Sequence, residues 1–203
     1  MSGIISQNVG RTSGLVKAVA AGGGAWTLIE TITASSDSTI DFDSSIDSTY
    51  PIYLFKFINL HASTNNTKPQ VNFRDGSTAY DATKTTTHYS CSHNEADNQT
   101  WLQYETGGDL AESTGDQTFF WQNVSNVDDA GANGELLLFS PSSTTFVKHF
   151  IGRLAVVANP VASGQGYIGG YCNTTAAIDG VQFKMNSGNI DAGTFKMYGL
   201  GDS

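Results

Sequence analysis

Charged residues are scarce in this chain of 203 residues. Lys and Arg number 10 and Asp and Glu number 19, so charged residues make up 14% of the chain and the formal net charge is −9. A chain this acidic repels the phosphate backbone of nucleic acids, which proteins bind through clustered basic side chains. The three arginines, Arg11, Arg74 and Arg153, lie far apart in the sequence. We therefore expect no nucleic-acid partner, and we interpret the acidity as a source of solubility.

Cysteine is also scarce, and long apolar runs are missing. Cys91 and Cys172 are the only two cysteines, which is too few for a disulfide framework, and we expect both thiols to be reduced. No stretch approaches the roughly 20 apolar residues of a membrane span. The first ten residues contain neither a basic nor an apolar signal region, which predicts synthesis in a cytoplasm and no membrane partner.

Hydroxyl and amide side chains take the place of charge. Ser, Thr and Asn account for 57 of the 203 residues and Gly for another 22. Ser and Asn compete with the backbone of a helix, whereas Thr suits a pleated sheet. The 11 Phe, 8 Tyr and 3 Trp residues supply a core that disordered chains lack. The composition therefore excludes an all-helical fold and general disorder.

Alternation of apolar and polar residues predicts roughly nine or ten strands from Trp26 onward. Strands are expected within residues 26–33, 40–42, 50–60, 69–74, 101–105, 119–124, 135–139 and 146–158. Residues 181–185 and 194–198 are predicted to form a hairpin around a Gly/Asn connection, and residues 76–100 a long polar loop. We expect an all-β, jelly-roll-like antiparallel β-sandwich as a single domain over residues 26–203.

The first 25 residues differ from the rest of the chain. They are rich in Gly and nearly free of aromatic residues, so they cannot form a core by themselves. We expect an extended N-terminal arm that docks on its own domain or on a neighbouring subunit. Its anchors would be Ile4, Ile5, Arg11, Leu15 and Val16.

The strand expected over residues 50–60 is apolar on both faces. One alternate set consists of Ile52, Leu54, Ile58 and Leu60, interrupted by Lys56, and the other of Tyr53, Phe55 and Phe57. If the first set faces the core, the aromatic set must be covered by the loop, the arm or another subunit, because leaving it in water costs about 25 cal/mol per Å². We expect a homo-oligomer, a trimer before a dimer, with Tyr53, Phe55 and Phe57 or the 146–158 strand near the subunit contact.

Two groups of residues have side chains that bind metals: His88, Cys91 and His93, and the aspartates Asp41, Asp43, Asp47, Asp128 and Asp129. The first group lacks the fourth ligand of a zinc site, so a polar loop explains it equally. The first three aspartates lack the glycine and glutamate of an EF-hand loop. They fit outward positions beside a strand, and calcium bound between loops remains the alternative. We expect no metal and no cofactor.

Catalytic motifs are missing as well. Nothing in the sequence pairs the five glutamates, Glu30, Glu95, Glu105, Glu112 and Glu135, as the two carboxylates of a glycosidase. A nucleophile elbow, a phosphate-binding loop and a metalloprotease motif are also absent from the sequence. We therefore expect no enzyme. Five aromatic residues, Trp101, Tyr104, Phe119, Phe120 and Trp121, either stack on sugar rings or belong to the core.

Three segments near the two ends resemble virion proteins of tailed bacteriophages, especially marine and environmental ones. They are NVGRTSGLVK at residues 8–17, WTLIET at 26–31 and SGNIDAGTFKMYG at 187–199. The resemblance implies a structural virion protein assembled in the host cytoplasm, either a capsid-decoration (cement) protein or a tail- or fibre-associated subunit. Its partners would be further copies of itself and major capsid or tail proteins. The alternative is a carbohydrate- or receptor-binding module of a tail fibre, with a host surface glycan as ligand.

Overall fold

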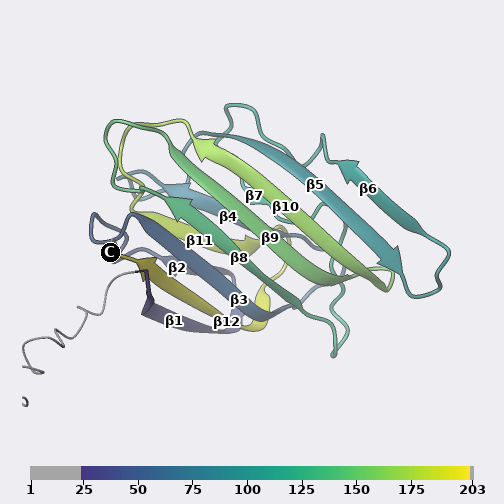
Figure 1. The fold of residues 1–203 in the computed structure, drawn as a ribbon. Helices are drawn as coiled ribbons and strands as arrows, with labels where there is room; N and C mark the ends of the chain where they lie inside the picture. Colours follow the sequence, from purple (N-terminus) through teal and green to yellow (C-terminus); the bar gives the residue numbers. More distant parts are fainter. Residues whose placement is uncertain (1–23, 202–203) are drawn as a thin grey trace, which may run out of the picture.

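The computed structural model describes residues 24–201, which form a two-layer antiparallel β-sandwich (Figure 1). The large sheet has the order β1-β12-β3-β8-β9-β10-β5-β6 and the small sheet the order β2-β11-β4-β7. The strands are β1 (Trp26–Asp37), β2 (Thr39–Phe42), β3 (Ile52–Ala62), β4 (Pro69–Arg74), β5 (Lys84–Asn94), β6 (Thr100–Tyr104), β7 (Gln117–Thr118), β8 (Ala132–Phe139), β9 (Lys148–Ala158), β10 (Ala162–Cys172), β11 (Gly180–Met185) and β12 (Ile190–Leu200). The all-β antiparallel sandwich expected from the sequence is confirmed.

The predicted arm anchors, Ile4, Ile5, Arg11, Leu15 and Val16, lie outside the described residues. Within residues 24–201, no helix is long and apolar enough to span a membrane.

Aromatic side chains fill the space between the two sheets. Phe183 of the small sheet is buried, and its ring centroid lies 5.5 Å from that of Phe57 and 5.7 Å from that of Phe195, both on the large sheet. Phe42, Phe55 and Phe119 complete the cluster around Phe183 at centroid distances of up to 6.3 Å. These tilted and offset contacts are the geometries that aromatic rings prefer. The cluster joins the two layers into one core.

Strand β3 lies inside the large sheet, between β12 and β8, as its apolar sequence predicted. Its aromatic set faces the small sheet: Tyr53 and Phe55 are 0% exposed and Phe57 is 2% exposed. These three side chains are covered within one chain, so they are unavailable for a subunit contact. The expectation that they lie at such a contact is corrected. The sequence argument assigned the core to the other alternate set, of which Lys56 and Ile58 are exposed.

The predicted C-terminal hairpin is wrong. Strand β11 pairs with β2 and β4 in the small sheet, whereas β12 pairs with β1 and β3 in the large sheet. The connection at residues 186–189 therefore crosses from one layer to the other. Alternation shows which side chains of a strand face the core, and two strands that face each other across a sandwich alternate in the same way as two strands of a hairpin.

The predicted loop over residues 76–100 is also wrong, because its second half contains the 11-residue strand β5. The inward positions of β5 carry polar side chains, Lys84, Thr86, His88 and Ser90, which are all buried. An apolar alternation is the usual signature of a half-buried strand. It is missing here, so the sequence did not reveal the strand.

The strand predicted over residues 119–124 is replaced by an irregular segment. Strand β7 ends at Thr118, and Phe119 and Phe120 then lie buried against the inner face of β10. The inward positions of β10 at this point are Gly164 and Gly166, whose missing side chains leave room for the two phenylalanines. This close approach lets an irregular segment pass between the layers.

Candidate functional site

The outer face of the large sheet carries a line of polar and aromatic side chains that crosses seven strands, which we call the transverse row. Each member is the direct cross-strand partner of the next: Lys196, Lys56, Glu135, Arg153, Tyr167, Tyr89 and Tyr104. Adjacent strands lie about 4.8 Å apart, so the row extends about 29 Å. The seven residues come from seven different strands and meet only through the sheet register.

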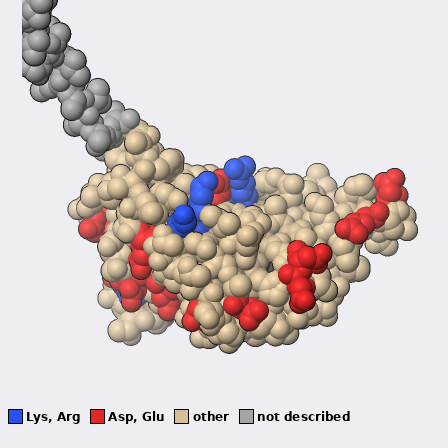
Figure 2. Space-filling model, turned by 90° about the horizontal axis from the view of Figure 1, so that it is seen from below, with Lys and Arg blue, Asp and Glu red and all other residues tan. Residues whose placement is uncertain are grey.

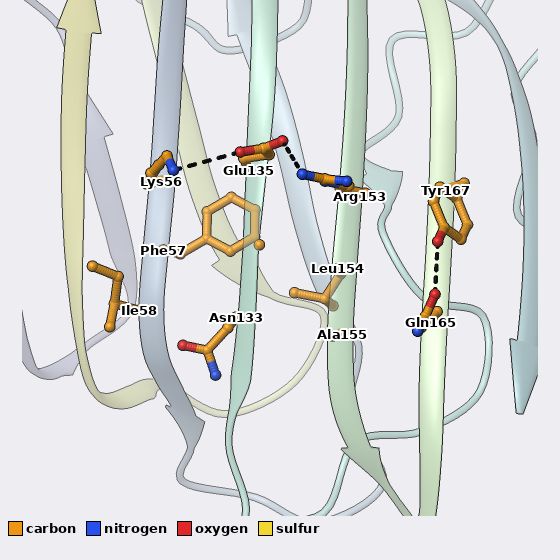
Figure 3. Close-up of a pocket in the computed structure, with 11 residues that line it drawn as sticks. Lys56, Phe57, Ile58, Asn133, Glu135, Arg153, Leu154, Ala155, Gln165 and Tyr167 are labelled. Atoms are coloured by element: carbon orange, nitrogen blue, oxygen red, sulfur yellow. Dashed lines mark hydrogen bonds and ion pairs between the residues drawn. The ribbon is translucent and has the colours of Figure 1, made fainter. Parts of the chain in front are cut away.

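One half of the row is charged. The Glu135 carboxylate forms an ion pair with Arg153, with Oε1 2.8 Å from Nη2, and its Oε2 lies 3.8 Å from Lys56 Nζ, as Figure 3 shows. The Arg153 and Lys56 side chains are 66% and 46% exposed. The carboxylate therefore holds two cations flat against the sheet, while both cations remain accessible to a ligand. Lys196 extends the charged half onto β12.

The other half of the row consists of three tyrosines. The rings of Tyr89 and Tyr167 stack at a centroid distance of 4.9 Å and an interplanar angle of 8°. Tyr104 follows on β6 and donates a hydrogen bond from its hydroxyl to Asp109 Oδ2 at 2.7 Å, and this hydrogen bond raises its pKa. Tyr89 and Tyr104 are 46% and 50% exposed. These rings lie on the outer face of the sheet, not in the core.

A shallow, open depression of about 440 Å³ adjoins the centre of the row. Its polar lining includes Asn133 and Gln165 together with Lys56, Glu135 and Arg153 of the row, and Ile58 and Ala155 supply apolar surface (Figure 3). In the sheet register Ala155 lies between Asn133 and Gln165. Its short side chain explains why the surface is hollowed there.

The charge of the row contrasts with the charge of the whole protein. Three of the eight Lys and Arg residues within 24–201 belong to the row. Figure 2 shows basic side chains gathered in one group, with acidic side chains spread over the other parts of the visible surface. Elsewhere Arg74 pairs with Asp179 at 2.8 Å and Lys184 with Asp116 at 2.6 Å. The row has three cations and one carboxylate, a net charge of +2, on a chain of net charge −9.

A second polar cluster lies inside the sandwich, beneath residues 105–118. Thr86 donates a hydrogen bond to Gln117 at 2.5 Å, and Ser90 donates one to the buried carboxylate of Glu105. His88 is fully buried, and neither of its ring nitrogens has a hydrogen-bond partner among the described residues. Burial lowers its pKa, which keeps the imidazole neutral. Because these side chains are covered, we interpret the cluster as structural.

Two buried lysines flank a buried cysteine at one end of the sandwich. Lys84 and Lys148 are both cross-strand partners of Cys172. Lys84 donates hydrogen bonds to two carbonyl oxygens, at 2.8 Å each, and burial lowers its pKa to about 8. Burial raises the pKa of the Cys172 thiol to about 12, so this thiol is not an activated nucleophile.

The candidate zinc ligands do not converge. His88 points into the core, whereas His93 is exposed and contacts Asp97 at 3.0 Å. Cys91 and Cys172 are free thiols, and Cys91 is partly exposed on β5. Within residues 24–201 no group of three or more His, Cys, Asp or Glu side chains is placed to hold a metal ion.

The candidate calcium ligands form hydrogen bonds within the protein. Asp47 accepts hydrogen bonds from the Thr49 amide at 2.8 Å and the Tyr53 hydroxyl at 3.2 Å, and the hydrogen bonding from Thr49 lowers its pKa. Asp41 accepts a hydrogen bond from Gln182 at 2.8 Å. Asp43 directly follows β2, two residues after Asp41, whereas Asp128 and Asp129 lie in another segment, beside a separate surface hollow.

The five glutamates lie on different elements: Glu30 on β1, Glu95 between β5 and β6, Glu105 just after β6, Glu112 between β6 and β7, and Glu135 on β8. Only Glu135 joins the transverse row. Its neighbours there are two cations and no second carboxylate, so its local environment does not match an acid pair of a glycosidase.

The five candidate sugar-binding aromatics separate into core and surface. Phe119 and Phe120 are buried in the core, and Trp101 packs against it. Lys68 Nζ lies 3.6 Å from the centroid of the Trp121 ring, a cation–π contact. Tyr104 alone of the five belongs to the transverse row. Sequence reasoning also considered Glu135, as a candidate catalytic carboxylate, but missed the other five members, because the pairing of strands far apart in sequence was not visible.

No protein-family model fits the chain, and no curated protein matches it.

Proposed function

We propose that this protein is a structural component of a tailed-phage virion, either a capsid-decoration protein or a tail-associated subunit. The resemblance of its end segments to phage virion proteins supports this role, and the antiparallel β-sandwich is compatible with it. The observation that carries the proposal is an open edge with exposed apolar side chains next to the predicted docking arm.

That edge is strand β1, which pairs only with β12 and leaves its other side without a strand among residues 24–201. It is 12 residues long, and Trp26 and Leu28 near its beginning are 41% and 51% exposed. Long edge strands present unpaired N–H and C=O groups, which a second chain readily pairs with. The arm predicted over residues 1–25 leads directly into this edge, so the two would form one continuous assembly contact.

The neighbour at this contact is another copy of the chain, in a trimer before a dimer, or a major capsid or tail protein. Exposed aromatic and aliphatic side chains at an edge support such a partner because they stabilise assembly when buried. The host cytoplasm is the compartment of assembly, and the virion is the final location.

The test is incorporation into particles of the phage that encodes the protein. Purified particles are analysed by mass spectrometry and by immunogold labelling, with the unaltered chain, the double variant Trp26→Ser/Leu28→Ser and the control Val127→Ser. Val127 is 49% exposed and lies between β7 and β8, outside both the β1 edge and the 146–158 strand. We expect normal incorporation of the control and a strong loss for the double variant.

A chain lacking residues 1–24 is expected to keep its β-sheet circular-dichroism signal and to incorporate poorly. Absence of the protein from purified particles would overturn the virion role. Equal incorporation of all variants would overturn the assignment of the assembly contact.

A further inference from the structure

We propose that the transverse row is a binding site for an acidic polysaccharide, a carbohydrate chain with carboxylate groups, laid across the strands of the large sheet. This inference concerns a different part of the surface from the β1 edge and does not depend on the virion role. It rests on the charge of the row, its mixture of polar groups, its open shape and its tyrosines.

The positive charge of the transverse row indicates what kind of ligand it binds. A net charge of +2 within one row of an otherwise acidic protein selects an anionic ligand, because other surface regions repel it. Lys56 and Arg153 are already positioned by Glu135, so a ligand carboxylate meets cations whose side-chain freedom is reduced. Arg153 meets Glu135 through Nη2 alone, as an ion pair, and a guanidinium has five N–H donors in total. The arginine therefore retains donors for a ligand carboxylate.

The mixture of groups distinguishes a sugar chain from a phosphate polymer. The Glu135 carboxylate lies between the cations, Asp109 lies at the Tyr104 end, and the amides of Asn133 and Gln165 line the depression. Carboxylates only accept hydrogen bonds and amides both donate and accept, so this surface needs a ligand rich in hydroxyl donors. Phosphate groups have no donors and are repelled by the two carboxylates. A polymer with many hydroxyls and widely spaced carboxylates satisfies both kinds of group.

The shape of the site favours a polymer over a small molecule. Small-molecule sites are concave and bury most of their ligand. The depression here is shallow, and the row continues beyond it on both sides. The whole row is about 29 Å long at the strand spacing of about 4.8 Å. Rows of side chains across a sheet are held by the backbone hydrogen bonds of the strands, so the site is rigid before binding.

The tyrosines supply apolar contact and orientation. Aromatic rings bury the C–H faces of a ligand and keep a polar hydroxyl for hydrogen bonding. Tyr89 and Tyr167 fix each other's orientation by stacking, and Tyr167 also donates a hydrogen bond to Gln165 at 2.6 Å. Three rings on consecutive strands continue the path of the charged half.

The experiment measures binding of the full-length protein to immobilised polysaccharides by biolayer interferometry at two salt concentrations. The probes are polygalacturonate, colominic acid (a sialic-acid polymer), neutral dextran and single-stranded poly(dT). The variants are Lys56→Gln/Arg153→Gln and Tyr89→Ala. The control is Lys184→Gln, which removes one positive charge from the small sheet. Urea-unfolding midpoints verify that each variant is folded.

We expect binding to at least one acidic polysaccharide, weaker binding at high salt and no binding to dextran. The row variants should bind at least about tenfold more weakly, because charge-assisted hydrogen bonds are the strong ones, and the control should bind as the unaltered chain does. Three outcomes overturn the proposal: no binding to either acidic polysaccharide, equal weakening by the Lys184 control, or tighter binding to poly(dT). A fourth is light scattering that shows an oligomer dissociated by the row variants, since the row would then be a contact between copies.

Discussion

Strand β10 approaches the segment after β7 so closely that one added methyl group should lower the stability of the whole domain. A Cβ atom on Gly166 would lie 1.8 Å from the carbonyl oxygen of Phe119, a backbone atom that moves only with its segment. A Cβ on Gly169, three residues further along the same strand, would meet nothing closer than 3.8 Å. The substitutions Gly166→Ala and Gly169→Ala are therefore the same chemical change on one strand, at a position that faces the core and at one that faces outward.

Overpacking a core typically costs about 1–3 kcal/mol, and we place Gly166→Ala at the upper end because the clash involves backbone. Replacing Gly by Ala also restricts the unfolded chain, which returns about 0.4–1 kcal/mol where the native backbone tolerates Ala. We expect a net loss of about 2–3 kcal/mol for Gly166→Ala and a small gain for Gly169→Ala. In a protein of this size the loss lowers Tm by about 4–12 °C.

Urea and thermal unfolding, followed by far-ultraviolet circular dichroism, measure both substitutions. The slope of the unfolding free energy against urea should be unchanged, since the same surface is exposed in each case. Equal unfolding midpoints for the two variants would refute the packing of Phe119 against β10. Destabilisation of Gly169→Ala to the same degree would show that loss of glycine, not the close approach, is responsible.

Three further predictions concern titratable groups. Lys84 has a pKa of about 8 in the folded protein against 10.5 in the unfolded chain. The unfolded chain therefore binds more protons between pH 8 and 10.5, so the free energy of unfolding should rise with pH, by on the order of 3 kcal/mol. Urea titrations should show that Lys84→Met loses this rise. Burial lowers the pKa of His88, so stability should fall as the pH drops below about 6.5, where the unfolded imidazole takes up a proton. His88→Leu should flatten this fall in urea titrations between pH 7 and 5, and an equal effect of His93→Leu would contradict the assignment. Ellman's reagent should modify Cys91 in the folded protein and Cys172 only after unfolding, and rapid modification of both thiols would contradict the burial of Cys172.

Local alternation predicted the fold class and several strands, because a half-buried strand must place apolar side chains at every second position. The strand beginning at Trp26 follows directly from it, whereas the inner position of β3 follows from apolar residues on both faces of that strand. The prediction failed where the buried face is polar, as in β5, and where a glycine-rich strand carries too few side chains to show a pattern, as in the inner face of β10.

The partners of each strand were decided only by the tertiary structure. Strands β11 and β12 alternate alike, and their sequences do not reveal that Phe183 and Phe195 face each other from opposite sheets. The direction of the aromatic set in β3 depends likewise on which side the small sheet covers. The transverse row has the same origin. Lys56, Arg153 and Tyr89 lie in one line across the sheet only because long-range strand pairing sets the register. Composition and alternation are properties of neighbouring residues along the chain, whereas register is set by contacts between segments far apart in sequence. A shift of the register by one residue would move every side chain of a strand to the opposite face.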